Sequence, residues 1–334
     1  MKKAIFLSKN KEKFNLVFPP ETIKKIGALT DLDERLYNKE DVQNAPHRFS
    51  DTELIFSTWG MPAFTEEEIR TCFPHLECVF YIAGSVQGFA RPFLACGVRV
   101  FSAWAAIAVP VAEYTISQIL LANKGFFPQT RLMERQKVSD AYALKNVYPG
   151  NYNEKIGLIG CGMIGSMVAG MLHEHQLEVL VYDPFLPAEK AESLGVTPCT
   201  LERLFSECRV ISNHLPNNAS TRSMLNYSLF SRMMPCSTFL NTGRGAQVVE
   251  ADLCRLLAER PDVTAVLDVT YPEPPELSHP FFTLPNCWLT PHVAGSIGKE
   301  TLRMSEYMID EATRYLGGKP CRYEVTEKML ATMA

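Results

Sequence analysis

The sequence has no large excess of charge of either sign. Its 334 residues include 33 lysines and arginines against 37 aspartates and glutamates, which gives a formal net charge of -4. Proteins that bind nucleic acid through its phosphates need a basic surface, and this composition supplies no global positive field. We therefore expect a small-molecule ligand and no nucleic-acid partner.

The sequence also lacks the usual signatures of metal, disulfide and membrane proteins. Its ten cysteines form no Cys-x-x-Cys pair and no cluster with histidine at zinc spacing, so we expect reduced thiols and no metal. The first apolar run, residues 4–7, is too short for a signal peptide. No run approaches the ~18 consecutive apolar residues of a membrane helix. These absences predict a cytoplasmic protein without a membrane partner.

Short apolar segments alternate with helix-like segments along the chain. This alternation predicts an α/β fold with parallel sheets covered by helices, and the length favours two domains of ~150 residues each. Residues 106–124 form a long apolar segment with helical periodicity, and 299–316 are expected to form a final amphipathic helix. The expected strands are 4–7, 53–57, 78–83 and 98–101, followed by 156–159, 179–182, 210–212, 238–240, 265–269 and 288–290.

A glycine-rich turn follows the strand expected at 156–159. Gly160, Gly162 and Gly165 form a G-x-G-x-x-G pattern, and residues from Met163 onward can continue as a helix. The first glycine permits a sharp turn, the second lets the backbone approach a pyrophosphate, and the third lets the helix pack on the strand. Amides at the helix N-terminus would hold the phosphates. The pattern in this context predicts dinucleotide binding.

An acidic residue ends the next expected strand. Asp183 lies eighteen positions after Gly165, close to the ~20 typical of a carboxylate that binds the adenosine ribose hydroxyls. A carboxylate there would repel a 2′-phosphate, so NAD is favoured over NADP. The alternative is a glycine-rich turn that binds nothing, with Asp183 capping the loop at Pro184.

Three polar residues follow expected strands in the second half of the chain. Arg244 lies in an Asn-Thr-Gly-Arg-Gly segment, Glu273 in a proline-rich segment, and His292 directly after Thr-Pro. Ligands of open α/β sheets bind at the carboxyl ends of the strands, so all three side chains are candidates for catalysis. Taken singly, each has a plainer interpretation as a surface charge, a loop carboxylate or a core imidazole.

Further motifs accompany these residues along the chain. In order they are the glycine turn, Tyr182-Asp183-Pro184, His214-Leu215-Pro216, Asn241-Thr242-Gly243-Arg244-Gly245, Leu267 through Glu273-Pro274, and Thr290-Pro291-His292-Val293-Ala294-Gly295. In kind and order these segments resemble the D-isomer-specific 2-hydroxyacid dehydrogenase family over essentially the whole chain. The resemblance implies NAD-dependent hydride transfer between nicotinamide and C2 of a D-2-hydroxy acid or its 2-oxo acid.

The resemblance also implies a role for each catalytic candidate. His292 would be the acid/base, giving a proton to the C2 oxygen during reduction and removing it in the reverse direction. Glu273 would pair with the other ring nitrogen and fix the tautomer. Arg244 would hold the substrate carboxylate in a two-pronged contact and polarise the C2 carbonyl.

Further contacts implied by the resemblance lie outside this triad. Backbone amides of Gly84, Ser85 and Val86 would bind the substrate carboxylate, although an ordinary strand-to-helix turn is the alternative. Asp268 would bind the nicotinamide amide, and the loop at His214 would lie beside the nicotinamide ribose. The expected NAD contacts are Gly160, Gly162, Met163, Ile164, Gly165, Asp183, His214, Pro216, Thr221, Thr242, Asp268, His292 and Gly295.

The substrate side departs from the family's pattern. Residues 83–88 lack the usual Gly-Val-Gly-Val-Asp-Asn, and Ser102 stands where an asparagine often follows the strand. Gly243 stands where alanine or serine is common. These departures leave the cofactor and acid/base chemistry intact and leave the substrate open.

The architecture implied by the resemblance is two Rossmann/flavodoxin-like doubly wound parallel-sheet domains with a cleft between them. A substrate domain of residues 1–103 and 300–334 would accompany an NAD-binding domain of residues 104–299. A homodimer through the cofactor domains is also implied, in agreement with the apolar surplus of 106–124. The alternative on the same fold is an NAD(H)-sensing, corepressor-like binding protein. A formate enzyme is disfavoured because those relatives carry glutamine in place of Glu273.

Overall fold

The computed structural model describes residues 1–331 and divides the chain into two compact units. The first unit is residues 1–107 and continues from Ser296, and the second unit is Ala108–Gly295. The expected domain boundaries, after residue 103 and before residue 300, each differ from these by four residues. The first difference arises because helix α6 (Trp104–Asn123) begins in one unit and ends in the other.

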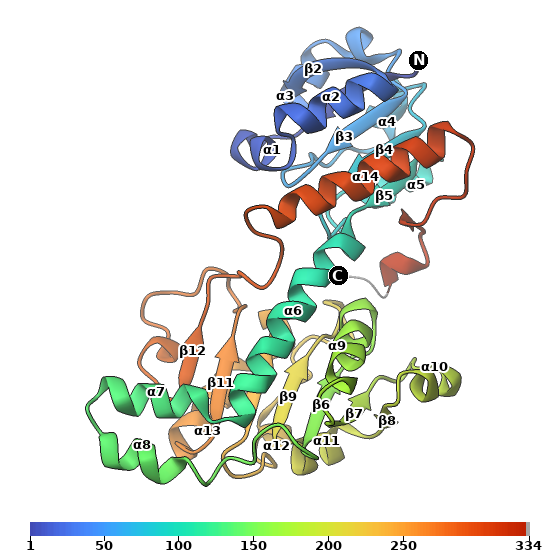
Figure 1. Ribbon diagram of the computed structural model, residues 1–334. Coiled ribbons are helices and arrows are strands. Elements are labelled where there is room, and N and C mark those ends of the chain that lie inside the picture. Colours follow the sequence, from blue (N-terminus) through green and yellow to red (C-terminus); the bar gives the residue numbers. More distant parts are fainter. Residues whose placement is uncertain (332–334) are drawn as a thin grey trace. The chain divides into compact units, whose positions relative to one another are not determined.

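The first unit contains a six-stranded sheet with the order β13-β5-β4-β3-β1-β2 (Figure 1). Neighbouring strands are parallel except β13, which runs antiparallel to β5. The strands are β1 (Lys3–Leu7), β2 (Asp31–Tyr37), β3 (Leu54–Ser57), β4 (Cys78–Tyr81), β5 (Arg99–Ser102) and β13 (Glu324–Val325). The helices are α1 (Lys11–Val17), α2 (Pro20–Leu29), α3 (Lys39–Asn44), α4 (Glu66–Cys72), α5 (Ala90–Ala95) and α14 (Glu300–Leu316), with 3₁₀ turns at Pro46–Phe49 and Met329–Ala331.

The core of the first unit lies on both faces of this sheet. On one face the rings of Phe56, Phe80 and Phe101 stack across β3, β4 and β5, with centroids 5.1 and 5.0 Å apart. Met304 and Met308 of α14 pack into the same cluster. Cross-strand aromatic contacts of this kind fix the register of a sheet, and so they hold the loops at its carboxyl edge in place.

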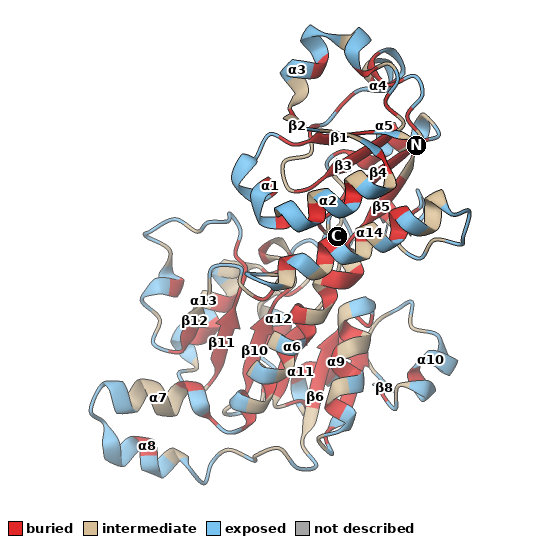
Figure 2. Ribbon diagram, turned by 45° about the horizontal axis from the view of Figure 1, so that its top comes forward, coloured by how far each residue is buried: buried red, intermediate tan, exposed pale blue. Residues whose placement is uncertain are grey.

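The second unit contains a seven-stranded, fully parallel sheet with the order β12-β11-β10-β9-β6-β7-β8. Its central strands are buried on both faces by helices, as Figure 2 shows for β6, β10 and β11. The strands are β6 (Lys155–Ile159), β7 (Glu178–Tyr182), β8 (Thr197–Pro198), β9 (Val210–Asn213), β10 (Thr238–Asn241), β11 (Thr264–Leu267) and β12 (Cys287–Leu289). The helices after α6 are α7 (Phe126–Glu134), α8 (Val138–Leu144), α9 (Met163–His173), α10 (Ala188–Ser193), α11 (Leu201–Glu207), α12 (Tyr227–Phe230) and α13 (Glu250–Glu259), with 3₁₀ turns at Gly245–Gln247 and Pro280–Phe282.

Helix α6 corrects one expectation from the sequence. Trp104–Asn123 is long and apolar enough, by length and composition, to cross a membrane, although no such segment was expected. The expectation was wrong because it counted only uninterrupted apolar runs, and polar residues such as Glu113 interrupt this one. Half of the segment is buried within the protein, where Ala112 and Ile119 join the core of the second unit. A core helix meets the same length and composition criterion.

Candidate active site

The glycine turn joins β6 to α9 in the second unit, and sterics require two of its glycines. Gly160 has a φ of 92°, and a Cβ there would lie 2.9 Å from the carbonyl oxygen of His214. A Cβ on Gly165 would lie 2.1 Å from the carbonyl oxygen of Gly160, so helix α9 can approach the strand only without one. A Cβ on Gly162 would meet no atom within 4 Å, which leaves the turn open at this point. This combination of tight packing and an open middle suits a pyrophosphate lying against the backbone.

Asp183 follows β7 and contacts the glycine turn directly. Its Oδ2 accepts the Cys161 N–H at 2.7 Å, and its Oδ1 accepts the Phe185 N–H at 2.9 Å. The carboxylate therefore caps its own loop, as the plainer interpretation expected, and also fixes the turn. An ionised carboxylate has about four acceptor positions, so two remain for ribose hydroxyls. The two interpretations are compatible.

His214 lies where β9 ends, against the glycine turn. Its Nε2 lies 2.9 Å from the Ser212 hydroxyl, while its Nδ1 is buried without a hydrogen-bond partner among the described residues. Burial lowers the pKa of this imidazole to about 4. The ring is therefore neutral at neutral pH. A buried nitrogen without a partner beside the turn fits a site completed by a polar ligand such as the cofactor.

Arg244 is positioned by a buried network of amides beyond the end of β10. Asn213 Nδ2 donates to Asn241 Oδ1 at 3.0 Å and to Gln247 Oε1 at 2.5 Å. The same Gln247 oxygen accepts the Arg244 N–H at 3.1 Å, and Asn241 Nδ2 donates to the Arg244 carbonyl at 3.2 Å. A Cβ on Gly243 would lie 2.8 Å from Gln247 Oε1, so this network explains the glycine found beside the arginine.

The guanidinium of Arg244 is held by few groups of the protein. Its Nη1 donates to the Gly243 carbonyl at 2.7 Å, and no carboxylate forms an ion pair with it within the described residues. Burial lowers the pKa of Arg244, and the nearby Glu273 carboxylate opposes that shift. Arginine stays charged under these conditions, so most of its donors are available to an anionic ligand.

Glu273 and His292 form a close pair at the carboxyl edge of β11 and β12. Glu273 Oε1 lies 2.6 Å from His292 Nδ1, and both side chains are about two-fifths exposed. The Nε2 atom of His292 has no partner among the described residues. An ionised carboxylate can only accept, so it places the proton on Nδ1 and leaves Nε2 to face a ligand.

The backbone of His292 adopts an unusual conformation, which buried Asp268 maintains. His292 has a φ of 55°, in the left-handed region that residues with side chains seldom occupy. Its N–H donates to the Asp268 carbonyl at 3.0 Å, and the Asp268 carboxylate accepts from the N–H groups of Val293 and Ala294 at 2.8 and 2.9 Å. The Thr290 hydroxyl donates to the same carboxylate at 2.5 Å. Asp268 therefore holds the loop that carries His292, a contact that was not expected beside its predicted role at the nicotinamide.

The Glu273 loop is anchored by residues that the sequence did not single out. Glu250, at the start of α13, accepts the Tyr271 N–H at 2.8 Å and lies 3.3 Å from His279 Nε2. Burial raises the pKa of the Glu250 carboxyl. Arg222 donates to the Tyr271 hydroxyl at 2.7 Å and lies over its ring. A carboxylate at a helix start and a surface arginine carry no distinctive sequence signal.

The remaining expected cofactor residues follow strands β6, β9, β10 and β12. The Thr221 hydroxyl donates to the Pro216 carbonyl at 2.6 Å, which closes the loop after β9. The Thr242 hydroxyl lies 3.4 Å from that of Thr115 on α6. Met163 is exposed at the start of α9, and Ile164 is partly buried beside it. Gly295 is the last residue of the second unit, three positions after His292.

The expected substrate loop follows β4 in the first unit. The Ser102 hydroxyl contacts the carbonyl oxygens of Ala83 and Gly84 at 2.8 and 2.6 Å, so the residue that departs from the family's pattern supports this loop. Val86 is buried in the core, whereas Ser85 is exposed. Within residues 1–331, the N–H groups of Gly84, Ser85 and Val86 have no acceptor. Adjacent free amides of this kind suit an anion.

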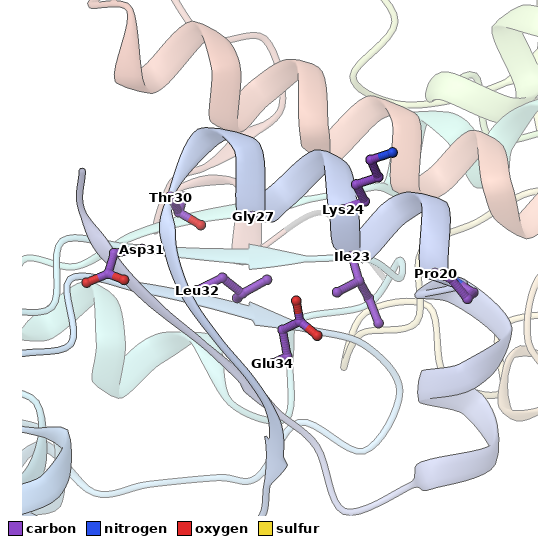
Figure 3. Close-up of a pocket in the computed structure, with 8 residues that line it drawn as sticks. All are labelled: Pro20, Ile23, Lys24, Gly27, Thr30, Asp31, Leu32 and Glu34. Atoms are coloured by element: carbon purple, nitrogen blue, oxygen red, sulfur yellow. The ribbon is translucent and has the colours of Figure 1, made fainter.

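A surface pocket lies elsewhere in the first unit. Its volume is about 660 Å³, and it lies between α2 and β2 (Figure 3). None of the expected catalytic or cofactor residues lines it, and no group of three or more potential metal ligands occurs in the part of the chain that the structure describes. The pocket's lining is Pro20, Ile23, Lys24, Gly27, Thr30, Asp31, Leu32 and Glu34.

Comparison with known proteins defines the class to which this fold and site belong. Residues 116–294 match the NAD binding domain of the D-isomer specific 2-hydroxyacid dehydrogenases, which is more than half of the chain and almost all of the second unit. The chain belongs to this family of oxidoreductases, its second unit is the NAD-binding domain, and its cofactor is NAD.

Particular relatives show how far the likeness extends. The chain is 28% identical to the D-3-phosphoglycerate dehydrogenase of Archaeoglobus fulgidus over 229 residues, which cover 69% of this chain and 43% of that protein. It is 33% identical to the erythronate-4-phosphate dehydrogenase of Ectopseudomonas mendocina over 226 residues, covering 67% and 53%. The chain thus spans less than half the length of the phosphoglycerate dehydrogenases that it matches.

Solved structures show the same fold over the whole chain. The apo form of D-mandelate dehydrogenase from Rhodotorula graminis superposes with a TM-score of 0.83 at 18% identity, covering 98% of both chains. The D-lactate dehydrogenase of Escherichia coli has a TM-score of 0.68 at 20% identity, covering 98% of this chain and all of that one. At these identities the likeness establishes the two-domain α/β architecture and nothing about the substrate.

Proposed function

We propose that this chain is an NAD-dependent dehydrogenase that interconverts a D-2-hydroxy acid and its 2-oxo acid. The observation that carries the proposal is the Glu273–His292 pair, whose 2.6 Å contact orients a ring with its other nitrogen unpartnered. Arg244 lies close enough for Glu273 to influence its pKa, so a cation, a carboxylate and an imidazole share one edge of the sheet. This set can bind an acid and move one proton.

The glycine turn, Asp183 and the loop at His214 would hold NAD. Bound there, NAD supplies the hydride chemistry at its nicotinamide ring. The open position at Gly162 and the amides of α9 suit the pyrophosphate. The remaining acceptor positions of Asp183 suit the adenosine ribose.

His292 would move the proton that accompanies hydride transfer. In the reducing direction the C2 oxygen gains negative charge, and the protonated imidazole gives it the Nε2 proton. In the oxidising direction the neutral ring accepts that proton from the hydroxyl. Glu273 keeps the Nδ1 proton in place throughout and stabilises the imidazolium form.

Arg244 would bind the substrate carboxylate and polarise the C2 carbonyl. Its planar fork matches two carboxylate oxygens, which a lysine cannot do. Its partial burial strengthens both contacts, because the screening by water is reduced. In the first unit, the free amides of Gly84, Ser85 and Val86 form a candidate anion site of their own.

The first unit by itself also offers a basic pocket for an anionic group. A pocket of about 400 Å³ follows the ends of β1 and β2 in the first unit, and Lys9, Lys11 and Lys39 line it. Lys39 already pairs with Glu68, whereas Lys9 and Lys11 form no ion pair within the described residues. A screen of 2-oxo acids should therefore include phosphorylated and sugar-derived acids beside simple ones.

The experiment that tests this function replaces the acid/base and measures two properties. His292→Ala should lower kcat for the best 2-oxo acid by at least a hundredfold while NADH binding stays within about threefold. His75→Ala, an exposed histidine of the first unit, is the matched control. An NADH-binding protein that reduces none of the acids would instead favour the NAD(H)-sensing alternative, which does not explain the Glu273–His292 pair.

We further propose that two copies associate through the second unit. Large apolar side chains are exposed on consecutive helices there: Leu121 of α6, Phe126 and Met133 of α7, and Val138 and Tyr142 of α8. Exposed apolar clusters of this kind mark interaction surfaces. Light scattering should give the mass of a dimer, and Phe126→Glu with Tyr142→Glu should give a monomer.

A further inference from the structure

Lys190 of α10 reaches back to the glycine turn. Its Nζ donates to the carbonyl of Cys161 at 3.1 Å, and Asp183 accepts the N–H of the same residue at 2.7 Å. An ammonium and a carboxylate therefore contact the two backbone polar groups of a single residue of the turn.

The position of this pair determines which ligand group it faces. Asp183 ends the strand after the glycine turn, where a carboxylate binds the hydroxyls of the adenosine ribose in this fold. A cation near that ribose is the feature that accommodates a 2′-phosphate. Asp183 is expected to repel a 2′-phosphate through its negative charge. Because Lys190 brings one positive charge to the same turn, it reduces that repulsion.

Both ionic groups can serve a ligand without breaking the turn. The two Asp183 oxygens are held by the N–H groups of Cys161 and Phe185, so the carboxylate stays in place whatever binds. Lys190 is exposed, and its contact to a carbonyl is weaker than one to a phosphate dianion. A flexible ammonium can therefore exchange the carbonyl for the phosphate, or bind both.

We propose that Lys190 forms a 2′-phosphate site and that the protein binds NADP(H) as well as NAD(H). Asp183 supplies the contacts to the ribose of NAD(H), and Lys190 offsets its repulsion when the 2′-phosphate is present. This inference concerns the adenosine end of the cofactor alone. It stands whether or not the proposed acid/base chemistry is correct.

Adenosine fragments test the proposal without catalysis. Calorimetry would compare 2′,5′-ADP with 5′-AMP, which differ only in the 2′-phosphate, on the wild-type protein and on Lys190→Met. The variant should lower the affinity for 2′,5′-ADP by about tenfold, the value of one charged hydrogen bond, and leave that for 5′-AMP within about twofold. Measured by fluorescence, the affinity for NADPH should likewise fall about tenfold in Lys190→Met, and the affinity for NADH should stay within about twofold.

Two further variants separate the proposal from a purely structural role of Lys190. Lys190→Arg should keep most of the affinity for 2′,5′-ADP, and Lys137→Met, another exposed lysine of the second unit, should change neither ligand. Equal weakening of 5′-AMP and 2′,5′-ADP in Lys190→Met would mean that the lysine only holds the turn. That result, or no measurable binding of 2′,5′-ADP to the wild-type protein, would overturn the proposal.

Discussion

Replacing Glu273 by glutamine should isolate the effect of its charge on His292, the proposed acid/base. The glutamine oxygen can still accept from His292 Nδ1, so the ring keeps its orientation while the negative charge is lost. Two unit charges ~4 Å apart attract by about 1 kcal/mol in water and about 4 kcal/mol near a protein surface. Both side chains are about two-fifths exposed, so water screens the attraction between their charges. The attraction lost with the carboxylate is therefore near the lower end of that range, at ~1–2 kcal/mol.

The lost attraction destabilises the protonated imidazole, which is the form proposed to donate a proton during reduction. The kcat for reduction of the best 2-oxo acid should therefore fall ~5- to 30-fold in Glu273→Gln. The assay is NADH consumption under saturating substrate, with NADH affinity measured separately by fluorescence. Glu276→Gln, an exposed glutamate in the same loop, is the matched control.

Two results would refute this reasoning about Glu273. A kcat within twofold of the wild-type value would show that the carboxylate does not assist His292. A fall in NADH affinity as large as the fall in kcat would show that the substitution disturbs the cofactor site instead.

Three further predictions address the substrate anchor, the glycine turn and the buried imidazole. Arg244→Lys should raise KM for the 2-oxo acid by tenfold or more with a smaller change in kcat, because one ammonium cannot replace the two-pronged contact; an unchanged KM would exclude the carboxylate contact. Gly165→Ala should abolish NADH binding or folding, since its Cβ would lie 2.1 Å from a carbonyl oxygen, whereas Gly170→Ala on the same helix meets no atom within 4 Å and should be tolerated. His214 has its folded-state pKa lowered to about 4, so the unfolded chain takes up a proton below pH ~6.5 that the folded protein excludes. Stability should fall by up to ~3 kcal/mol between pH 6.5 and 4, and a wild-type protein that loses no more than His214→Gln over that range would contradict the burial of this ring.

The sequence predicted the parts of the structure that depend on local patterns. The glycine turn is one, because φ and close packing at Gly160 and Gly165 are properties of the turn itself. Six of the seven strands of the second unit are another, since each is a short apolar run between helices. Strand β8 (Thr197–Pro198) was missed because it is only two exposed residues long. Strand β2 was missed because Asp31–Tyr37 is mostly charged; it lies at the edge of its sheet, where charged residues are tolerated.

The contacts that position the candidate catalytic residues could not be predicted in the same way. The network around Arg244 joins Asn213, Asn241 and Gln247, which come from the ends of two strands and the turn that follows. Glu250 reaches the Glu273 loop only because α13 begins beside it. Such contacts depend on how segments distant in the sequence pack together. A single polar residue at a helix start or strand end does not indicate which distant residue it will contact.

The most direct test of the central claim is a comparison of enantiomers. The purified protein would be incubated with NAD and the D or L form of each 2-hydroxy acid in the panel, and NADH formation would be followed by absorbance. We predict that one or more D acids are oxidised, that the matching L acids are not, and that His292→Ala abolishes the reaction. Oxidation of L acids, or no NADH from any D acid by a protein that binds NADH, would contradict the account.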